Sequence, residues 1–273
     1  MSERIPVAIL GASGRMGATL LRCLPEFPAL ALAGASTAAE TGLAGRDAGE
    51  AVGLASMDVV LHDDPAGALA GGARVAVDFT LPAAVAANAA ACRAAGVGLV
   101  CGVTGLDARA EAALREAAEA VPVLWAPNMS AGVAVLERLA ALAAAALADF
   151  DAGVYEVHHT AKRDAPSGTA LALGRAVVEG RGQPPAAAAP DERLRAGGLA
   201  YAAERLGDVV GEHTVTLAGP GERLELTHRA TDRAIFARGA LRAAAWLAGR
   251  EPGMYTLGDV LGLGRVDTLA GGQ

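Results

Sequence analysis

The segment from Glu156 to Thr169 concentrates side chains that can hold or move a proton. It contains His158, His159 and Lys162, and Lys162 is the only lysine among the 23 lysine and arginine residues of the chain. Histidine changes its charge near neutral pH, and lysine, unlike arginine, can lose its proton inside a protein. We therefore expect proton chemistry in this segment.

The same segment ends in an Asp-Ala-Pro-Ser-Gly-Thr turn that leads into a helix predicted at residues 167–179. At a helix start, the hydroxyls of Ser167 and Thr169 and the backbone N–H groups can bind a carboxylate. The alternative is a basic surface loop in which Ser167 is an ordinary N-cap. The two are compatible, because a cap and an anion use the same unsatisfied N–H groups. His213 and His228 lie on predicted strands among charged residues, where a structural or interdomain role is expected.

A glycine-rich turn follows the first predicted strand, at residues 5–10, and opens a helix predicted at residues 15–24. Glycines in this context let the backbone approach a pyrophosphate, which the helix N-terminus binds through its N–H groups. The spacing departs from G-x-G-x-x-G, since Ser13 and Met16 occupy the second and third glycine positions. An ordinary strand-to-helix turn is the alternative. The residues predicted to bind a dinucleotide here are Gly11, Ala12, Ser13, Gly14, Arg15 and Met16.

Three later strand ends carry small, hydroxyl or amide residues. Any one of them alone is typical of an ordinary strand end, but ligands of open parallel sheets bind beyond the carboxyl ends of the strands. We therefore expect these positions to complete the cofactor pocket. They are Phe79, Thr80, Gly102, Val103, Thr104, Ala126, Pro127, Asn128 and Met129.

The end of the second strand bears on the choice of cofactor. An acid that binds the ribose of NAD is expected there, about 20 residues after the glycines. Residues 35–38 read Ala-Ser-Thr-Ala, and the first acid is Glu40. No arginine stands there to bind a 2′-phosphate either. The cofactor is therefore predicted as NADH or NADPH, with a slight preference for NADPH.

Short apolar runs alternate with alanine-rich helical stretches over the first 130 residues. Strands are predicted at 5–10, 30–35, 74–79, 97–101 and 121–125, and helices at 15–24, 82–95 and 107–120. This alternation predicts βαβ units and a Rossmann-like parallel sheet. After a helix at 133–148, strands are predicted at 152–158, 199–203, 209–217 and 223–228, and a last helix at 232–249. The last three strands lack intervening helices, which predicts a second, α+β domain with an antiparallel or mixed sheet.

Composition narrows the classes of partner. Hydrophobic residues make up 53% and charged residues 19%, which is typical of a folded core. The net charge of −7 and the scattered arginines give no sign of nucleic acid or of an anionic membrane. No signal-peptide core or membrane-length apolar run is found, so a cytoplasmic protein is expected. Cys23, Cys92 and Cys101 lack metal-ligand spacing and are expected to be buried free thiols, and no metal site is predicted.

The sequence resembles the dihydrodipicolinate reductase family from Val7 to about Leu263. The match includes the turn at 11–17 in the form Gly-x-x-Gly-Arg-Met-Gly and the Gly-Val-Thr-Gly stretch at 102–105. Its most specific part is the His-His-x-x-Lys-x-Asp-Ala-Pro-Ser-Gly-Thr run at 158–169. The resemblance implies reduction of the dicarboxylate 4-hydroxy-tetrahydrodipicolinate, or its dehydrated form, to tetrahydrodipicolinate in diaminopimelate and lysine biosynthesis.

The resemblance also implies an architecture and roles for residues. A dinucleotide-binding domain at 1–130 is completed by the tail at 240–273, and a substrate-binding and tetramerisation domain spans 131–239 of a homotetramer. By matching position, His158 is implied as proton donor or acceptor and Lys162 as second proton donor, after hydride transfer from the nicotinamide. The residues implied to grip the substrate carboxylate are His159, Gly168 and Thr169, to which the helix argument adds Ser167.

Two departures and two rival hypotheses accompany this resemblance. The family's acid after the second strand is absent, and residues 181–199 form a short Ala/Pro-rich region in which no substrate contact is expected. One rival is a dehydrogenase of another amino-acid pathway that acts through a thioester on Cys101. The other is a non-catalytic dinucleotide sensor, which would have no need of a lone lysine beside two histidines.

Overall fold

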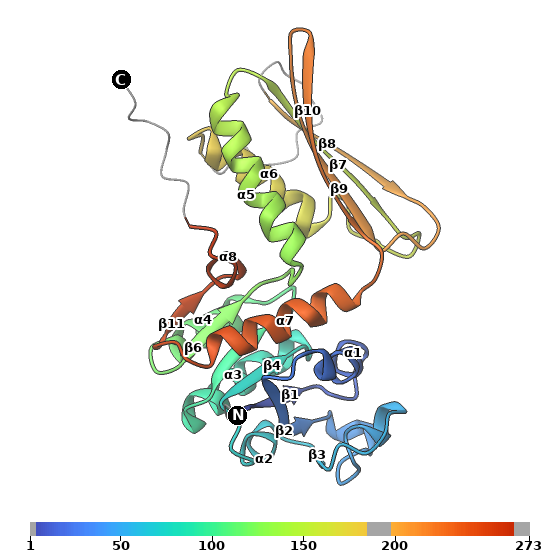
Figure 1. Cartoon of the computed structure of the whole chain (residues 1–273), viewed down its shortest axis with the longest axis vertical. Coiled ribbons are helices and arrows are strands. Elements are labelled where there is room, and N and C mark those ends of the chain that lie inside the picture. Colours follow the sequence, from blue (N-terminus) through green and yellow to red (C-terminus); the bar gives the residue numbers. More distant parts are fainter. Residues whose placement is uncertain (1–3, 185–197, 265–273) are drawn as a thin grey trace. The chain divides into compact units, whose positions relative to one another are not determined.

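A computed structural model describes residues 4–184 and 198–264 of the chain. Its strands and helices divide into two units, Met1–Met129 with Ala234–Leu261, and Ser130–Arg233 (Figure 1). The chain returns to the first unit at Ala234, whereas the predicted tail begins at residue 240. Residues 185–197 of the Ala/Pro-rich region and residues 265–273 of the tail lie outside the described part of the chain.

The first unit is built on a parallel sheet with the strand order β11-β6-β5-β4-β1-β2-β3. The strands are β1 (Ile5–Leu10), β2 (Leu30–Ser36), β3 (Leu61–His62), β4 (Val75–Asp78), β5 (Gly98–Cys101), β6 (Pro122–Trp125) and β11 (Gly253–Tyr255). The five strands predicted in this region are present, and the prediction of a Rossmann-like sheet is confirmed. The short strands β3 and β11 were not predicted, because two or three residues carry no periodic signal.

Helices cover both faces of this sheet. The helices of the first unit are α1 (Arg15–Cys23), α2 (Pro65–Leu69), α3 (Pro82–Ala95), α4 (Ala108–Ala118), α7 (Ala234–Leu247) and α8 (Leu257–Val260), with 3-10 turns at Leu24–Glu26, Ala39–Thr41 and Glu50–Val52. Ala8 and Leu10 of β1 share an apolar core with α2, α3 and α4. Alternate side chains of a strand point to opposite faces, and α1 and α7 pack together on the other face (Figure 1).

Helix α7 is buried along most of its length because it lies against both α1 and the sheet. This explains why its apolar positions follow no single face in the sequence. Small residues let it approach closely: a Cβ added to Gly239 would lie 1.7 Å from the carbonyl oxygen of Met129. Among the helices of the described residues, none combines the length and the hydropathy needed to cross a bilayer.

The second unit contains a mixed sheet with the order β10-β9-β7-β8, which confirms the predicted α+β architecture. Its elements are α5 (Ala131–Ala146), β7 (Asp151–His158), α6 (Gly168–Gly180), β8 (Leu199–Arg205), β9 (Gly211–Gly219) and β10 (Glu222–Ala230). β7 pairs with β8 in parallel and with β9 antiparallel, and β9 and β10 form a hairpin. Helices α5 and α6 lie side by side and bury Leu136 and Leu173 against this sheet (Figure 1).

Candidate functional site

The glycine-rich turn connects β1 to α1 in the interior of the parallel sheet. Gly11 has a φ of +77°, in the left-handed region that favours glycine, and a Cβ there would lie 2.9 Å from Thr80 Cγ2. A Cβ on Gly17 would lie 2.2 Å from the Gly11 carbonyl oxygen, so turn and helix are in close contact. The N-terminus of α1 has no side-chain cap. Its first N–H groups can therefore meet an anion, and the turn fits a pyrophosphate.

The residues predicted to bind the cofactor come together at one edge of this sheet. Residues 11–16 follow β1, residues 79–80 follow β4, residues 102–104 follow β5 and residues 126–129 follow β6. These four strands are consecutive neighbours and all run in parallel, so their carboxyl ends share an edge. The chain leaves β1 toward β2 on one side and β4 lies on the other. The glycine turn is therefore at the topological switch point, where dinucleotides bind.

Buried Asp78, the last residue of β4, holds the loop that follows it. Its carboxylate accepts hydrogen bonds from the Thr80 N–H at 2.8 Å, the Thr80 hydroxyl at 2.7 Å and the Asn88 amide at 2.9 Å. Burial raises the pKa of Asp78 above its usual value, although these hydrogen bonds oppose the rise. The ring of Phe79 in this loop lies against Gly102, where a Cβ would come within 2.3 Å of it. Sequence reasoning did not identify Asn88, which reaches Asp78 from the second turn of α3.

The end of β2 carries hydroxyl side chains in place of the acid that binds the ribose of NAD. The Ser36 hydroxyl accepts a hydrogen bond from the Gly11 N–H at 3.3 Å, and the hydroxyls of Ser13 and Thr37 are 2.6 Å apart. Glu40 is exposed in the turn beyond. Neutral hydroxyls do not repel a 2′-phosphate and can also hydrogen-bond a ribose, so this strand end is compatible with either cofactor.

The histidine–lysine segment is the connection between β7 and α6. Ser167 is the N-cap of α6, and its hydroxyl accepts a hydrogen bond from the Ala170 N–H at 3.1 Å. A Cβ added to Gly168 would have no atom within 4 Å, so a ligand can approach this helix start closely. The cap predicted for Ser167 is therefore present, and the backbone beside it is accessible.

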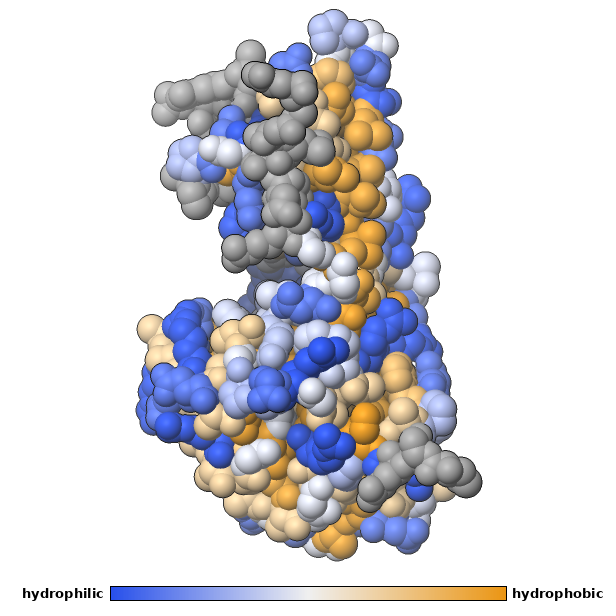
Figure 2. All heavy atoms as spheres, turned by 60° about the vertical axis from the view of Figure 1, so that its left-hand side comes forward, coloured by the Kyte–Doolittle hydropathy of each residue, from blue (hydrophilic) through white to orange (hydrophobic). Residues whose placement is uncertain are grey.

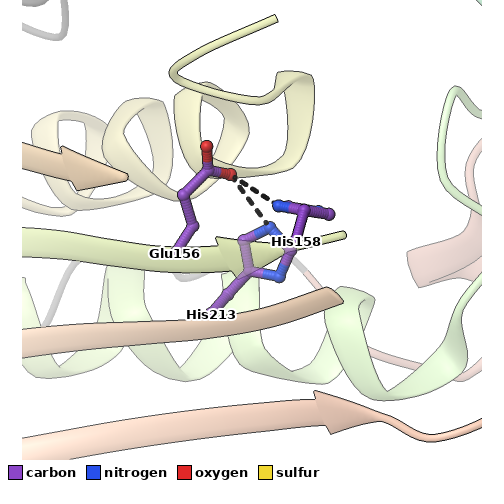
Figure 3. A group of neighbouring side chains, drawn as sticks. All are labelled: Glu156, His158 and His213. Carbon is purple, nitrogen blue, oxygen red and sulfur yellow. Dashed lines mark ion pairs between the residues drawn. The ribbon is translucent and has the colours of Figure 1, made fainter. Parts of the chain in front are cut away.

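Glu156, His158 and His213 form a buried cluster beside this helix start (Figure 3). Glu156 Oε2 lies 3.4 Å from His158 Nδ1 and 3.6 Å from His213 Nε2. The two imidazole rings meet edge to face, with centroids 5.0 Å apart. Glu156 and His213 are direct partners in the β7–β9 ladder, and His158 is two residues from Glu156 on the same face of β7.

A structural or interdomain role was expected for His213, and Glu156 was not singled out from the sequence. The two-residue spacing between Glu156 and His158 was the available signal, since it puts both side chains on one face of a strand. His213 had no such signal, because it comes from a strand whose pairing with β7 is a tertiary event.

Burial and charge oppose each other in this cluster. Burial raises the pKa of Glu156, but the nearby His213 ring and the hydrogen bonding of Ser167 outweigh it and bring the pKa from 4.5 down to about 2. Burial lowers the pKa of His158 from 6.5 to about 4, against the charge of Glu156, which raises it. At neutral pH a carboxylate therefore faces a neutral imidazole.

Arg205, at the end of β8, donates hydrogen bonds both to the connection between β7 and α6 and to Glu156 of the buried cluster. Its Nη2 donates to Glu156 Oε1 at 3.2 Å and to the Asp164 carbonyl, and its Nε donates to the Lys162 carbonyl at 3.2 Å. Lys162 Nζ in turn donates to both carboxylate oxygens of Asp164, each at 2.8 Å. Arg205 was not predicted, and the parallel pairing that sets it opposite His158 brings it here.

The residues predicted to bind substrate lie together in this connection and in the first turn of α6. They are His159, Ser167, Gly168 and Thr169. His159 Nε2 is 2.9 Å from Arg233 Nη2, a partner that sequence reasoning did not find because it is 74 positions away. The segment therefore combines cationic side chains with a helix N-terminus, an arrangement suited to an anionic ligand.

Cys101, the alternative nucleophile, is fully buried at the end of β5. Burial and the nearby charge of Asp78 raise the pKa of its thiol to about 12. A thiol with this pKa stays protonated at neutral pH and is a poor nucleophile. The buried thiol therefore gives no support to the thioester hypothesis for Cys101. Cys23, Cys92 and Cys101 are all buried free thiols, as predicted.

The buried cluster also has residue types that can bind a metal ion. The ligand atoms of Glu156, His158 and His213 lie within 4.8 Å of one another. However, Arg205 already balances the Glu156 charge, and His213 Nε2 is 3.2 Å from the Ser167 hydroxyl. A cation would have to displace or tolerate these partners, so the geometry favours an internal polar network.

Comparisons with known proteins agree over most of the chain. The family model described as dihydrodipicolinate reductase, N-terminus, matches residues 5–129, and that described as dihydrodipicolinate reductase, C-terminus, matches residues 132–261. A 4-hydroxy-tetrahydrodipicolinate reductase of Anaeromyxobacter dehalogenans is 48% identical over 264 residues, 94% of this chain and 97% of the relative. One of Thiobacillus denitrificans is 47% identical over 266 residues, 95% and 99% of the two chains.

A solved structure supports the fold. It is a dipicolinate-bound dihydrodipicolinate reductase from Paenisporosarcina sp. TG-14, which aligns with a TM-score of 0.76. The alignment covers 93% of this chain and 98% of the other, at 24% sequence identity. At this identity the likeness is evidence for the shared fold.

Proposed function

The chain belongs to the dihydrodipicolinate reductase family, and from this premise we propose that it reduces 4-hydroxy-tetrahydrodipicolinate, or its dehydrated form, to tetrahydrodipicolinate. This is a step of diaminopimelate and lysine biosynthesis. The observation that carries the proposal is the buried Glu156–His158–His213 cluster next to the open N-terminus of α6. It puts a titratable imidazole beside a structure that attracts carboxylates, as the reduction of a dicarboxylate requires.

The connection between β7 and α6 binds the substrate carboxylates in this proposal. Gly168 and Thr169 begin α6, where the helix dipole and the first N–H groups favour an anion. Ser167 shapes this helix start through its cap. His159, held by Arg233 at 2.9 Å, adds a positively charged neighbourhood for a carboxylate.

His158 and Lys162 supply protons in this proposal. The pKa of His158, about 4 in the ligand-free protein, leaves its imidazole neutral at pH 7. A dianionic substrate close to the ring raises that pKa, since an opposite charge favours the protonated form. Substrate binding therefore loads His158 with the proton that the reduced ring needs. Lys162, paired with exposed Asp164, is the second donor.

NADH or NADPH binds at the carboxyl edge of the parallel sheet and, when bound, supplies the hydride. The left-handed Gly11, the uncapped start of α1 and the hydroxyls of Ser13 and Thr37 support this proposal. Phe79 and Gly102, packed together at the ends of β4 and β5, would line the nicotinamide side.

We also propose a homotetramer that works in the cytoplasm. Figure 2 shows hydrophobic residues gathered in a band on the unit with the mixed sheet. Exposed apolar side chains of this unit include Val135, Leu139 and Leu142 on α5, Tyr155 on β7 and Leu224 on β10. Burying such residues between subunits is favourable. The buried free thiols suit a reducing compartment, and sedimentation analysis measures the oligomeric state directly.

The test is oxidation of NADH and NADPH, side by side, with purified protein and freshly generated substrate. Lys162→Ala should lower kcat by about 100-fold or more, the scale of proton-transfer catalysis. Arg163→Ala is the matched control, because it removes an exposed cation from the adjacent position. It should stay within about twofold of wild type, as a surface substitution does.

Cofactor binding without any substrate-dependent oxidation would contradict the reductase and favour the dinucleotide sensor. Equal losses in Lys162→Ala and Arg163→Ala would instead contradict the role of Lys162, because they would report general charge rather than a specific donor.

A further inference from the structure

Glu156 is a fully buried carboxylate with partners on four segments of the second unit. Its Oε1 accepts the Ser167 N–H at 3.0 Å and Arg205 Nη2 at 3.2 Å. Its Oε2 faces His158 on β7 and His213 on β9. A buried charge is costly unless it is paired and hydrogen-bonded, so a carboxylate retained at this point joins the start of α6 to three strands.

The Oε2 atom has a more specific relation to His158. Neither Glu156 Oε2 nor His158 Nδ1 has a conventional hydrogen-bond partner among the described residues, and the two atoms face each other at 3.4 Å. The two atoms form a charge pair and not a hydrogen bond in this geometry, and we assign Glu156 as the acceptor of a proton on Nδ1. The other ring nitrogen, Nε2, lies on the side of Gly211, which lacks the side chain that would cover it. Fixing the proton on Nδ1 leaves Nε2 as the nitrogen that exchanges a proton with a ligand.

The Oε1 atom acts at longer range through Arg205. The same guanidinium that pairs with Glu156 donates to the carbonyls of Lys162 and Asp164. These are backbone contacts, so they set the path of the connection rather than the charge of its side chains. Without Glu156, the half-buried guanidinium of Arg205 would lose its ion-pair partner, and this position of its side chain would no longer be stabilised.

We propose that Glu156 is a positioning residue, which orients His158 for proton transfer through Oε2 and holds the connection carrying Lys162 through Oε1 and Arg205. The inference rests on the proposed function, because it assigns the residue that makes His158 and Lys162 competent. Because Glu156 is fully buried, it acts through His158 and Arg205 in this proposal. Its role resembles that of a carboxylate behind a catalytic imidazole, which selects the tautomer and stabilises the protonated ring.

The charges around His158 predict the direction of a pH effect. Glu156 on β7 raises the pKa of His158, whereas His213 on β9, Lys162 in the connection and Arg205 on β8 lower it. Glu156→Gln keeps the shape and removes a carboxylate that raises the pKa of His158. His158 must be protonated to donate, so activity is lost as the pH rises through its pKa. This basic limb should therefore move to lower pH in the variant.

The first measurement uses the wild-type protein and needs no activity. Nitrogen-15 NMR at neutral pH distinguishes the two neutral tautomers of histidine, and His158→Asn assigns the signal. We expect the proton of His158 on Nδ1, the less common tautomer of a free imidazole. A proton on Nε2 would overturn the inference, whether or not the protein proves to be a reductase.

The second measurement is the pH profile of kcat. Glu156→Gln should lower kcat by about 10- to 100-fold, as the loss of a supporting carboxylate does, and shift the basic limb down by about one pH unit or more. Glu156→Asp should restore the limb because it restores the charge, and it also serves if Glu156→Gln fails to fold. Glu225→Gln, whose exposed side chain pairs with Arg223 on the same sheet, is the control.

If Glu156→Gln is folded and the basic limb of its kcat profile lies at the wild-type pH, Glu156 has only a structural role and the inference is overturned. If the wild type shows no turnover at all, the proposed reductase fails instead, and the tautomer measurement still decides whether Glu156 orients His158.

Discussion

Replacing Gly211 with alanine would test the position of His158 with a single methyl group. A Cβ at residue 211 would lie 3.0 Å from His158 Nε2, 3.2 Å from His158 Cδ2 and 3.8 Å from His213 Cε1. The backbone of Gly211 is not left-handed, so alanine can adopt it without strain. The added methyl group therefore acts only by pressing on the two rings, and mainly on the nitrogen proposed to exchange the proton.

The size of the effect follows from these distances. Ordinary contact for a Cβ begins near 3.4 Å, so the His158 ring must move by roughly 0.4 Å. Misplacement of a catalytic group by about 1 Å can cost about 100-fold in rate, so a loss on the order of tenfold in kcat is expected. Overpacking a buried site costs about 1–3 kcal/mol, which a urea or thermal unfolding measurement would detect.

The assay compares kcat, the KM for substrate, the Kd for the reduced cofactor and the Tm of each variant. Gly153→Ala is the matched control, since it adds the same methyl group on neighbouring β7, where the nearest atom would be 4.0 Å away. Cofactor affinity should be unchanged in both variants, because the glycine turn is in the other unit. A Gly211→Ala enzyme with full kcat would refute the placement of the reactive nitrogen, and so would an equal loss in Gly153→Ala.

Two further outcomes are expected. Gly11→Ala should weaken dinucleotide binding by tenfold or more, as measured by fluorescence titration. The reason is that residue 11 has φ +77° and that an added Cβ would press on Thr80. Unchanged affinity would exclude this turn as the phosphate site. The free energy of unfolding in urea should fall as the pH is lowered from about 6.5 to about 4, because His158, with a folded pKa of about 4, binds protons more readily when unfolded. Glu156, whose folded pKa is about 2, continues this loss below its unfolded value of 4.5. His158→Gln should flatten the upper part of the curve, and an unaltered slope there would contradict the assigned shift.

Most regular elements of this chain could be predicted from local sequence. The apolar run of β1 and the proline-led helix α3 begin and end where expected, because burial on both faces of a parallel strand leaves a continuous apolar signal. The glycine turn and the histidine–lysine segment could also be recognised from the sequence, because each is a continuous stretch of the chain. β3 and β11 were missed because their pairing, and not their composition, makes them strands.

The candidate site was predicted only where its residues are close in the chain. The N-cap at Ser167 was predicted correctly, because a helix start has a local signature. Arg233 was not found, because its contact with His159 depends on how the chain folds back. Asn88 and Arg205 were not predicted for the same reason.

The sequence by itself determined the type of chemistry and the two kinds of sheet, because residue types and hydrophobic periodicity are properties of short stretches. Only the tertiary structure decided which groups act together. The register of β7 with β9 puts His213 opposite Glu156, and its register with β8 puts Arg205 opposite His158. A slip of one residue in either ladder would turn these side chains to the other face of the sheet. The spacing of Glu156 and His158 on β7 is local, but their partners His213 and Arg205 are products of strand pairing, which packing of the apolar face determines and no short segment encodes.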